Sequence, residues 1–133
     1  MTDFSRRMVF WAPRVLSLMF ILYLSLFALD VFTEGRGFWR TLTALLIHLI
    51  PSFVLVAVTI LAWRWEWVGA ALFGTAGLAY ILMVFLRPLP GAIRASWIAA
   101  VAGPALVIAL LYMANWLNRE EIRRARRGYQ RSM

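Results

Sequence analysis

A single histidine lies inside one of the long apolar stretches of this 133-residue sequence. This residue, His48, belongs to the segment ALLIHLIP (44–51). Polar groups within such stretches are costly to bury in lipid, so they are candidate functional residues. Three roles are open to His48: a hydrogen-bonded packing residue, a group that handles protons or ions, and a metal ligand.

The spacing of the polar residues around His48 places them on one helix face. Four of them are separated by 7, 4 and 7 positions: Thr41, His48, Ser52 and Thr59. At about 100° per residue they fall within about 40° of one another. We predict that this polar stripe faces the interior of a helical bundle, because an imidazole facing lipid would lack a hydrogen-bond partner. If the helix continues into the following turn, Glu66 extends the same line.

Asp30, in the segment FALDVF (27–32), is a carboxylate near the end of the first apolar stretch. A negative charge at a helix C-terminus opposes the helix dipole, so we expect a nearby cation to compensate it. Arg36 and Arg40 follow in the same hairpin and are the predicted partners. Contact between Asp30 and His48 would depend on helix rotation, which the sequence does not fix.

Structural roles explain the two remaining polar candidates. We expect Glu66 to pair with Arg64 or a neighbouring arginine, and Asn115 to form a hydrogen bond between helices. A metal site needs about four ligands, and one histidine with scattered carboxylates does not supply them. The sequence has no cysteine and no nucleophile-elbow, P-loop, HExxH or dinucleotide-binding motif. We therefore predict no catalytic residue, no metal and no cofactor.

The elements that position these residues are four apolar runs in a chain that is 63% hydrophobic and 15% charged. The runs have 18–22 residues each and cover about 15–32, 41–62, 68–86 and 96–117. About 20 residues cross the roughly 30 Å of hydrocarbon in a bilayer. Because the connections are short, neighbouring helices should be antiparallel. We predict an all-α integral membrane protein of one domain, four transmembrane helices in an up-down-up-down bundle, with a basic tail over 118–133.

The arginines predict the orientation of these helices. The N-terminal segment, the turn at 63–67 and the tail hold three, one and six arginines, whereas the other two connections hold four together. Arginine-rich short loops stay in the cytoplasm, so both termini should be cytoplasmic in a prokaryotic inner membrane. All seven tryptophans lie at the ends of the runs, as in the aromatic belts of membrane proteins.

Small residues spaced by about four predict where helices approach closely. We expect them to close the third and fourth helices on each other, with a dimer interface as the alternative use. They are Ala70, Gly74 and Gly77 in the third run, and Ala95, Ala99 and Gly103 in the fourth.

The net charge of +8 suggests an anionic partner. Since the basic residues lie at the boundaries of the apolar runs, we expect anionic lipid headgroups and no nucleic acid. The candidate headgroup contacts lie in the tail: Arg119, Arg123, Arg124, Arg126 and Arg127.

Three segments in this order resemble a family of small, uncharacterised four-span prokaryotic membrane proteins: FALDVF (27–32), ALLIHLIP (44–51) and AWRWEWVG (62–69). Gly77 and Tyr80 also resemble the third span of that family. The resemblance covers about residues 15–117, and it implies the four-span fold and no particular activity. The positions that it picks out are Asp30, His48, Pro51, Trp63, Trp65 and Glu66.

The polar residues suffice to lock a bundle and are too sparse for a substrate path. The leading hypothesis is therefore a non-enzymatic structural or accessory subunit, which packs against a larger membrane protein or against itself. The alternative is a small channel or transporter, in which the stripe around His48 lines a path for protons, ions or small solutes. A third class, a lipid-binding or lipid-modifying protein, would require a cavity open to the bilayer near Asp30 or His48.

Overall fold

The computed structural model describes residues 3–35 and 37–131, with the side chains of residues 3, 6, 34 and 121–131 left undescribed. The described chain is all-helical, which confirms the predicted fold class. Its elements in order are α1 (Asp3–Phe27), the 3-10 helix η1 (Ala28–Glu34), α2 (Phe38–Arg64), α3 (Glu66–Phe85), α4 (Gly91–Trp97), the π-helical segment η2 (Ile98–Ala102) and α5 (Gly103–Arg131).

Four segments are long and apolar enough to cross a membrane, as the sequence predicted. They are Arg7–Thr33, Phe38–Arg64, Glu66–Phe85 and Gly91–Glu120. Each overlaps one of the predicted runs, and the last combines α4, η2 and α5.

The first helix begins at Asp3, well before the expected start near Val15. Pro13 therefore lies in the interior of α1 rather than in its opening turn. A proline there removes one backbone hydrogen bond. At its other end α1 tightens into η1, which stops at Gly35 in the left-handed conformation (φ 60°, ψ 22°). Glycine adopts this conformation without steric cost and is the usual residue after a helix end.

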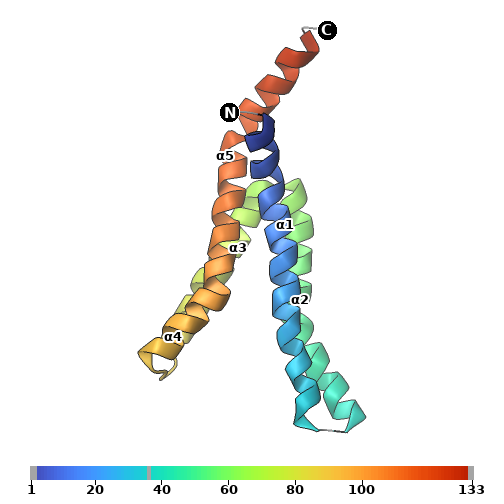
Figure 1. The fold of residues 1–133 in the computed structure, drawn as a ribbon, viewed down its shortest axis with the longest axis vertical. Coiled ribbons are helices and arrows are strands. Elements are labelled where there is room, and N and C mark those ends of the chain that lie inside the picture. The colour runs from blue at the N-terminus through green and yellow to red at the C-terminus, as the bar shows by residue number, and fades with distance from the viewer. Residues whose placement is uncertain (1–2, 36, 132–133) are drawn as a thin grey trace.

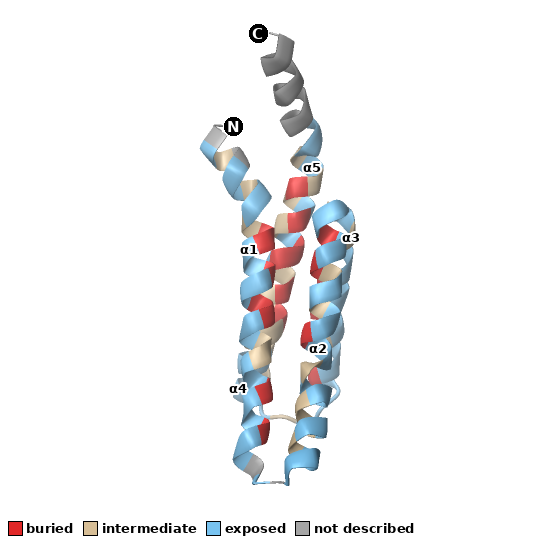
Figure 2. Cartoon of the chain, turned by 90° about the vertical axis from the view of Figure 1, so that its right-hand side faces the viewer, coloured by how far each residue is buried: buried red, intermediate tan, exposed pale blue. Residues whose placement is uncertain are grey.

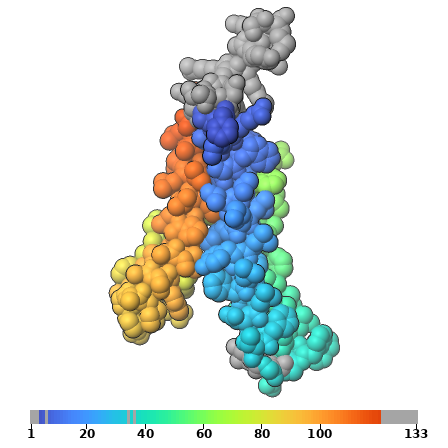
Figure 3. All heavy atoms as spheres, viewed as in Figure 1, coloured from blue at the N-terminus to red at the C-terminus, as the bar shows by residue number. Residues whose placement is uncertain are grey.

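Figure 1 traces the chain down α1, back along α2 to the turn at Trp65, away again along α3, and back through α4 and α5. The α1–α2 arm comprises α1, η1 and α2; the α3–α5 arm comprises α3, α4, η2 and α5. The two arms meet near the Trp65 turn, which we call the closed end. Figure 3 shows that they separate toward the connections at 35–37 and 86–90, which we call the open end.

The core lies where the two arms meet. Helix α5 packs most extensively on α3 and also contacts α1, while α2 contacts α1 and α3. Figure 2 shows the buried residues on the facing sides of these helices and the exposed ones outside. The core residues are mainly small or aromatic: Phe20, Ala62, Ala70, Phe73, Ala105, Ile108, Ala109 and Tyr112.

Close approach at the closed end depends on Gly69. A Cβ atom there would lie 2.6 Å from the Cβ of Ala62 and 3.0 Å from the ring of Tyr112. Real Cβ atoms do not come this close to another carbon, so only glycine lets the start of α3 approach both the end of α2 and α5 in this way. The rings of Phe73 and Tyr112 stack beside this contact, with centroids 6.0 Å apart.

The small residues of the fourth run pack differently from the prediction. Ala95 and Ala99 are exposed, and the buried small residues are Ala102, Ala105 and Ala109. The reason is the π-helical segment η2, in which the N–H of Gly103 donates to the carbonyl of Ile98. A π-helical turn contains one more residue than an α-helical turn. Residues spaced by four on the two sides of η2 therefore do not lie on the same face of the helix. Pro104, which lacks an N–H, follows directly and favours such a bulge.

Candidate functional site

The most buried charged group of the described chain is Arg14, in the middle of α1, with only 5% of its surface exposed. Its Nη2 atom lies 3.4 Å from the Oε1 atom of Glu66. Glu66 is the first residue of α3, because Trp65 adopts an extended conformation (φ −129°, ψ 91°) that ends α2. The turn thereby directs the carboxylate toward α1 rather than along the face of α2.

Asn115, in α5, also contacts the carboxylate of Glu66. Its Nδ2 atom donates a hydrogen bond of 2.7 Å to Oε1 of Glu66, and Asn115 is 1% exposed. This contact confirms that Asn115 makes an interhelical hydrogen bond. We call Arg14, Glu66 and Asn115 the polar clamp, since one carboxylate oxygen joins three helices.

Arg14 has further partners within α1. Its Nη1 atom donates to the carbonyl of Phe10, and its guanidinium lies over the Phe10 ring, 3.6 Å from the centroid. The Oγ of Ser17 donates to the carbonyl of Arg14 at 2.9 Å. A buried guanidinium needs both a counter-charge and hydrogen-bond acceptors, and these contacts supply them.

The clamp corrects the predicted environment of Glu66. The expected partner was Arg64 or a neighbouring arginine, whereas the structure pairs Glu66 with Arg14, 52 positions away. Glu66 also does not continue the stripe of α2, because it belongs to α3. The sequence reasoning missed Arg14, which it counted among the basic residues of the N-terminal segment. The available signal was an arginine with apolar residues on both sides, in FWAPRVLS (10–17).

The predicted polar stripe is divided by the structure. Ser52 and Thr59 are buried, at 4% and 2% exposure, and the Oγ of Ser25 donates to the Oγ of Ser52 at 3.1 Å across the α1–α2 contact. Thr41 is half-buried.

His48 is exposed on the outside of α2, so the expectation that it faces the bundle interior is wrong. Ser52, about 40° from His48 on the helix, lies in the α1–α2 contact, but the buried strip of α2 does not extend to His48. The ring does not lack a partner, because its Nδ1 atom lies 2.8 Å from the carbonyl oxygen of Ala44 in the same helix.

Asp30 is exposed in η1, and its backbone carbonyl accepts a hydrogen bond from the Oγ1 of Thr33 at 2.7 Å. Among the described residues, no ion pair joins Asp30 to Arg40, and no contact joins it to His48. The predicted partner Arg36 lies outside the described residues.

The described part of the chain contains no group of three or more histidine, cysteine or carboxylate residues that could hold a metal ion. The tail arginines are described only at Arg119, which lies over the ring of Trp116 at 5.1 Å. The side chains of Arg123, Arg124, Arg126 and Arg127 lie outside the described set.

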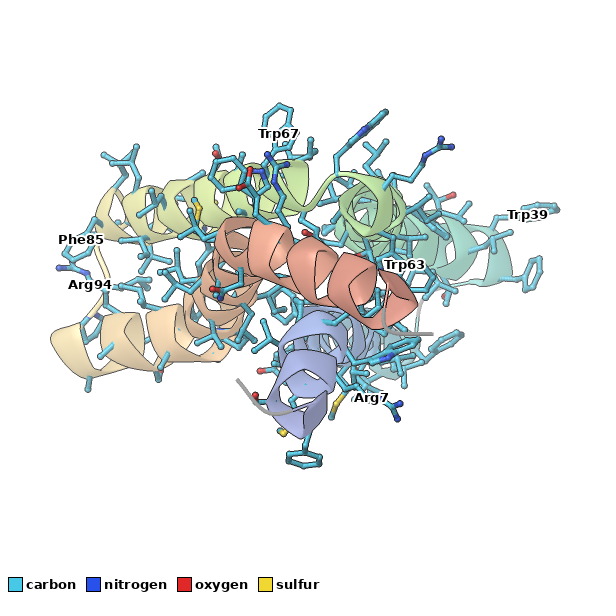
Figure 4. The ribbon with its side chains drawn as sticks, turned by 90° about the horizontal axis from the view of Figure 1, so that it is seen from above. Arg7, Trp39, Trp63, Trp67, Phe85 and Arg94 are labelled. Carbon is cyan, nitrogen blue, oxygen red and sulfur yellow. The ribbon has the colours of Figure 1, made fainter. Side chains whose placement is uncertain are left out.

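A cavity of about 450 Å³ opens above the polar clamp at the closed end. It lies between the α2–α3 turn, α5 and the first turns of α1, and its lining is aromatic and charged: Phe10, Arg64, Trp65, Glu66, Trp67, Asn115, Trp116 and Arg119. Figure 4 looks down on this end and shows Trp67 on the α3 side of α5, with Arg7 on the opposite side, next to α1.

Below the clamp, two buried hydroxyls lack hydrogen-bond partners among the described residues: the hydroxyl of Tyr112 and the Oγ1 of Thr59. Ser17 and Trp63 lie near the Tyr112 hydroxyl but do not satisfy it. Polar groups in a bundle interior are usually paired, so these two are exceptions.

These features define the class: an all-α chain with four long apolar helical segments, three of which are joined at one end by a buried ion pair and its hydrogen bond. The chain belongs to the family described as Domain of unknown function (DUF7670), which matches residues 1–126. No curated protein and no solved structure matches the chain. The family's description states no activity, in agreement with the expectation from the resemblance that the fold comes without a named function.

Proposed function

We propose that the chain is a multi-pass protein of a prokaryotic cytoplasmic membrane, in which it serves as a non-enzymatic structural or accessory subunit. The four helices would cross the bilayer in alternate directions, with both termini in the cytoplasm. The arginine-rich closed end supports this orientation, because basic residues collect on the cytoplasmic side. The apolar outer faces of the helices are suited to hydrocarbon rather than to water.

The polar clamp is the observation that carries the structural role. Its charged groups contact one another across α1, α3 and α5. The guanidinium of Arg14 lies beside the Oε1 atom of Glu66, and the amide of Asn115 donates to that oxygen. Ser25 and Ser52 likewise bond to each other. Polar side chains that satisfy one another across helices hold a membrane bundle together, and such groups are not free to carry a substrate.

Helix α2 is the part of the chain that supports an accessory role. Only 11% of its most apolar window is buried, against 28% for each of the other three segments. Its outer face carries large exposed residues such as Leu46, Phe53 and Ile60. This helix is therefore the expected contact with a larger membrane protein or a second copy.

Native mass spectrometry of gently solubilised membranes tests this role, and a partner or a homo-oligomer is the expected species. Photo-crosslinkers at Leu46 and Phe53 on α2 should form protein adducts more efficiently than a matched crosslinker at Leu78, which is equally exposed on the outside of α3. A lone monomer, with equal and weak crosslinking at all three positions, would contradict the accessory role.

A channel or transporter remains the second candidate because the buried hydroxyls of Tyr112 and Thr59 have no hydrogen-bond partner in the part of the chain that the structure describes. Internal water would satisfy them, and a hydrated path would pass these groups rather than His48. Proton or ion flux should be measured in proteoliposomes with the wild type, Thr59→Val and His48→Ala. Flux that is lost in Thr59→Val and kept in His48→Ala would support transport, and absence of flux in the wild type would exclude it under those conditions.

A further inference from the structure

The cavity at the closed end has the charge of an anion site. Arg64 and Arg119 are two exposed arginines in its lining, and among the described residues no ion pair neutralises either of them. The carboxylate that also lines the cavity, Glu66, is already held by Arg14 and Asn115. These two arginines, which no carboxylate of the described side chains pairs with, therefore determine which charge the cavity attracts.

The backbone at the start of α3 adds donors to the same place. Helix α3 has no side-chain cap, and the first of its N–H groups to be bonded are those of Val68 and Gly69, both to the carbonyl of Trp65. The preceding N–H groups belong to Glu66 and Trp67, two residues that line the cavity, and they make no backbone hydrogen bond within the described chain. Phosphate oxygens are acceptors for such groups and for arginine forks.

The aromatic lining indicates the depth of the cavity in a bilayer. Trp65, Trp67 and Trp116 line it, and tryptophan collects at the level of lipid headgroups. A volume of about 450 Å³ lies within the range of about 300–1,000 Å³ that is usual for small-molecule sites.

We infer that this cavity binds a phosphate group through Arg64 and Arg119, either in an anionic phospholipid headgroup or in a soluble phosphate ester. This site is distinct from general attraction of lipids to the basic tail, because it lies where the ends of α1, α2, α3 and α5 come together. The inference goes beyond the proposed accessory role and does not depend on it, since a site can be occupied in a monomer.

Native mass spectrometry of the full-length protein in detergent tests the site, with phosphatidylglycerol as the probe lipid and diacylglycerol as its phosphate-free control. One phosphatidylglycerol should bind at lower concentration than any further copies. The variants Arg64→Gln and Arg119→Gln should each weaken this first binding about tenfold, as expected for loss of one charge-assisted contact.

Arg7→Gln is the matched control. It removes the same charge from an exposed arginine at the same end of the molecule, on the side of α5 away from Trp67 (Figure 4). Its first binding constant should change less than about threefold, because long-range attraction at this distance is largely screened. Thermal unfolding of all three variants should match the wild type, which excludes misfolding as a cause.

Competition with glycerol 3-phosphate separates the two sources of phosphate. Displacement of the first lipid at millimolar concentration would support a soluble phosphate ester, and persistence of the lipid would support a headgroup. The inference would be overturned if diacylglycerol bound as tightly as phosphatidylglycerol, or if Arg7→Gln weakened binding as much as the two cavity variants.

Discussion

Removal of the Glu66 carboxylate is the sharpest test of the polar clamp. In Glu66→Ala the guanidinium of Arg14, whose side chain is only 7% exposed, loses its counter-charge. The buried amide of Asn115 loses its acceptor at the same time. Three helices are therefore affected by one substitution, and the free energy of unfolding should fall.

The expected loss follows from the geometry of the clamp. Removal of one partner from a buried ion pair costs about 3–5 kcal/mol. Two features reduce the cost here: the Glu66 side chain keeps 18% exposure, and Arg14 retains the carbonyl and the ring of Phe10. We expect a loss of about 2–4 kcal/mol, after partial solvent screening of the pair.

A double-mutant cycle isolates the ion pair from the other effects. The free energy of unfolding should be measured by reversible titration with a denaturing detergent in mixed micelles, for the wild type, Arg14→Met, Glu66→Gln and the double variant. Glu66→Gln keeps the shape of the side chain, whereas Arg14→Met keeps only the apolar stem and loses the contacts with Phe10. The cycle cancels this separate loss, so the coupling energy reports the Arg14–Glu66 interaction, and it should be about 1–3 kcal/mol. A coupling energy below about 0.5 kcal/mol, or a loss in Glu66→Ala below about 1 kcal/mol, would refute the reasoning.

The same unfolding assay checks three further predictions. Gly69→Ala places a methyl group 2.6 Å from the Cβ of Ala62 and should lower the free energy of unfolding by about 1–3 kcal/mol. In the matched Gly74→Ala the new Cβ lies 3.7 Å from its nearest neighbour, so this variant should be stabilised by up to about 1 kcal/mol. Equal effects of the two substitutions would contradict the close approach at Gly69. Tyr112→Phe removes a buried hydroxyl that has no partner among the described residues, so stability should stay the same or rise by about 1 kcal/mol, and a marked loss would reveal a partner. His48→Ala, on the outer face, should change stability by less than about 0.5 kcal/mol, and a larger loss would return the imidazole to the packed interior.

The number of apolar helices could be predicted from the sequence because it depends on the length of apolar runs, and run length does not depend on tertiary contacts. The contact made by Asn115 could also be predicted, since an amide near the end of an apolar run requires a partner. In contrast, the identity of that partner depends on how far α3 is rotated by the extended residue Trp65. No periodicity in the sequence reveals a single non-helical residue of this kind.

The prediction for His48 failed for a related reason. Helical spacing correctly grouped Ser52 and Thr59, both buried, but a shared face does not determine the width of the buried strip. At His48 the buried strip does not reach the ring, whose Nδ1 atom lies 2.8 Å from the carbonyl oxygen of Ala44. The rule that an imidazole in an apolar helix needs a hydrogen-bond partner was sound, but the partner came from the same helix, so burial was not required.

The polar clamp also sets an order of events during synthesis of the chain. Glu66 follows Arg14 by 52 positions, and Asn115 follows Glu66 by 49. Translation adds about 5–20 residues per second. Several seconds therefore pass between the synthesis of Arg14 and that of its counter-charge, Glu66. During that interval the guanidinium lacks its counter-charge and keeps only the carbonyl and ring of Phe10, within its own helix. The complete set of clamp contacts can therefore form only after Asn115 has been synthesised.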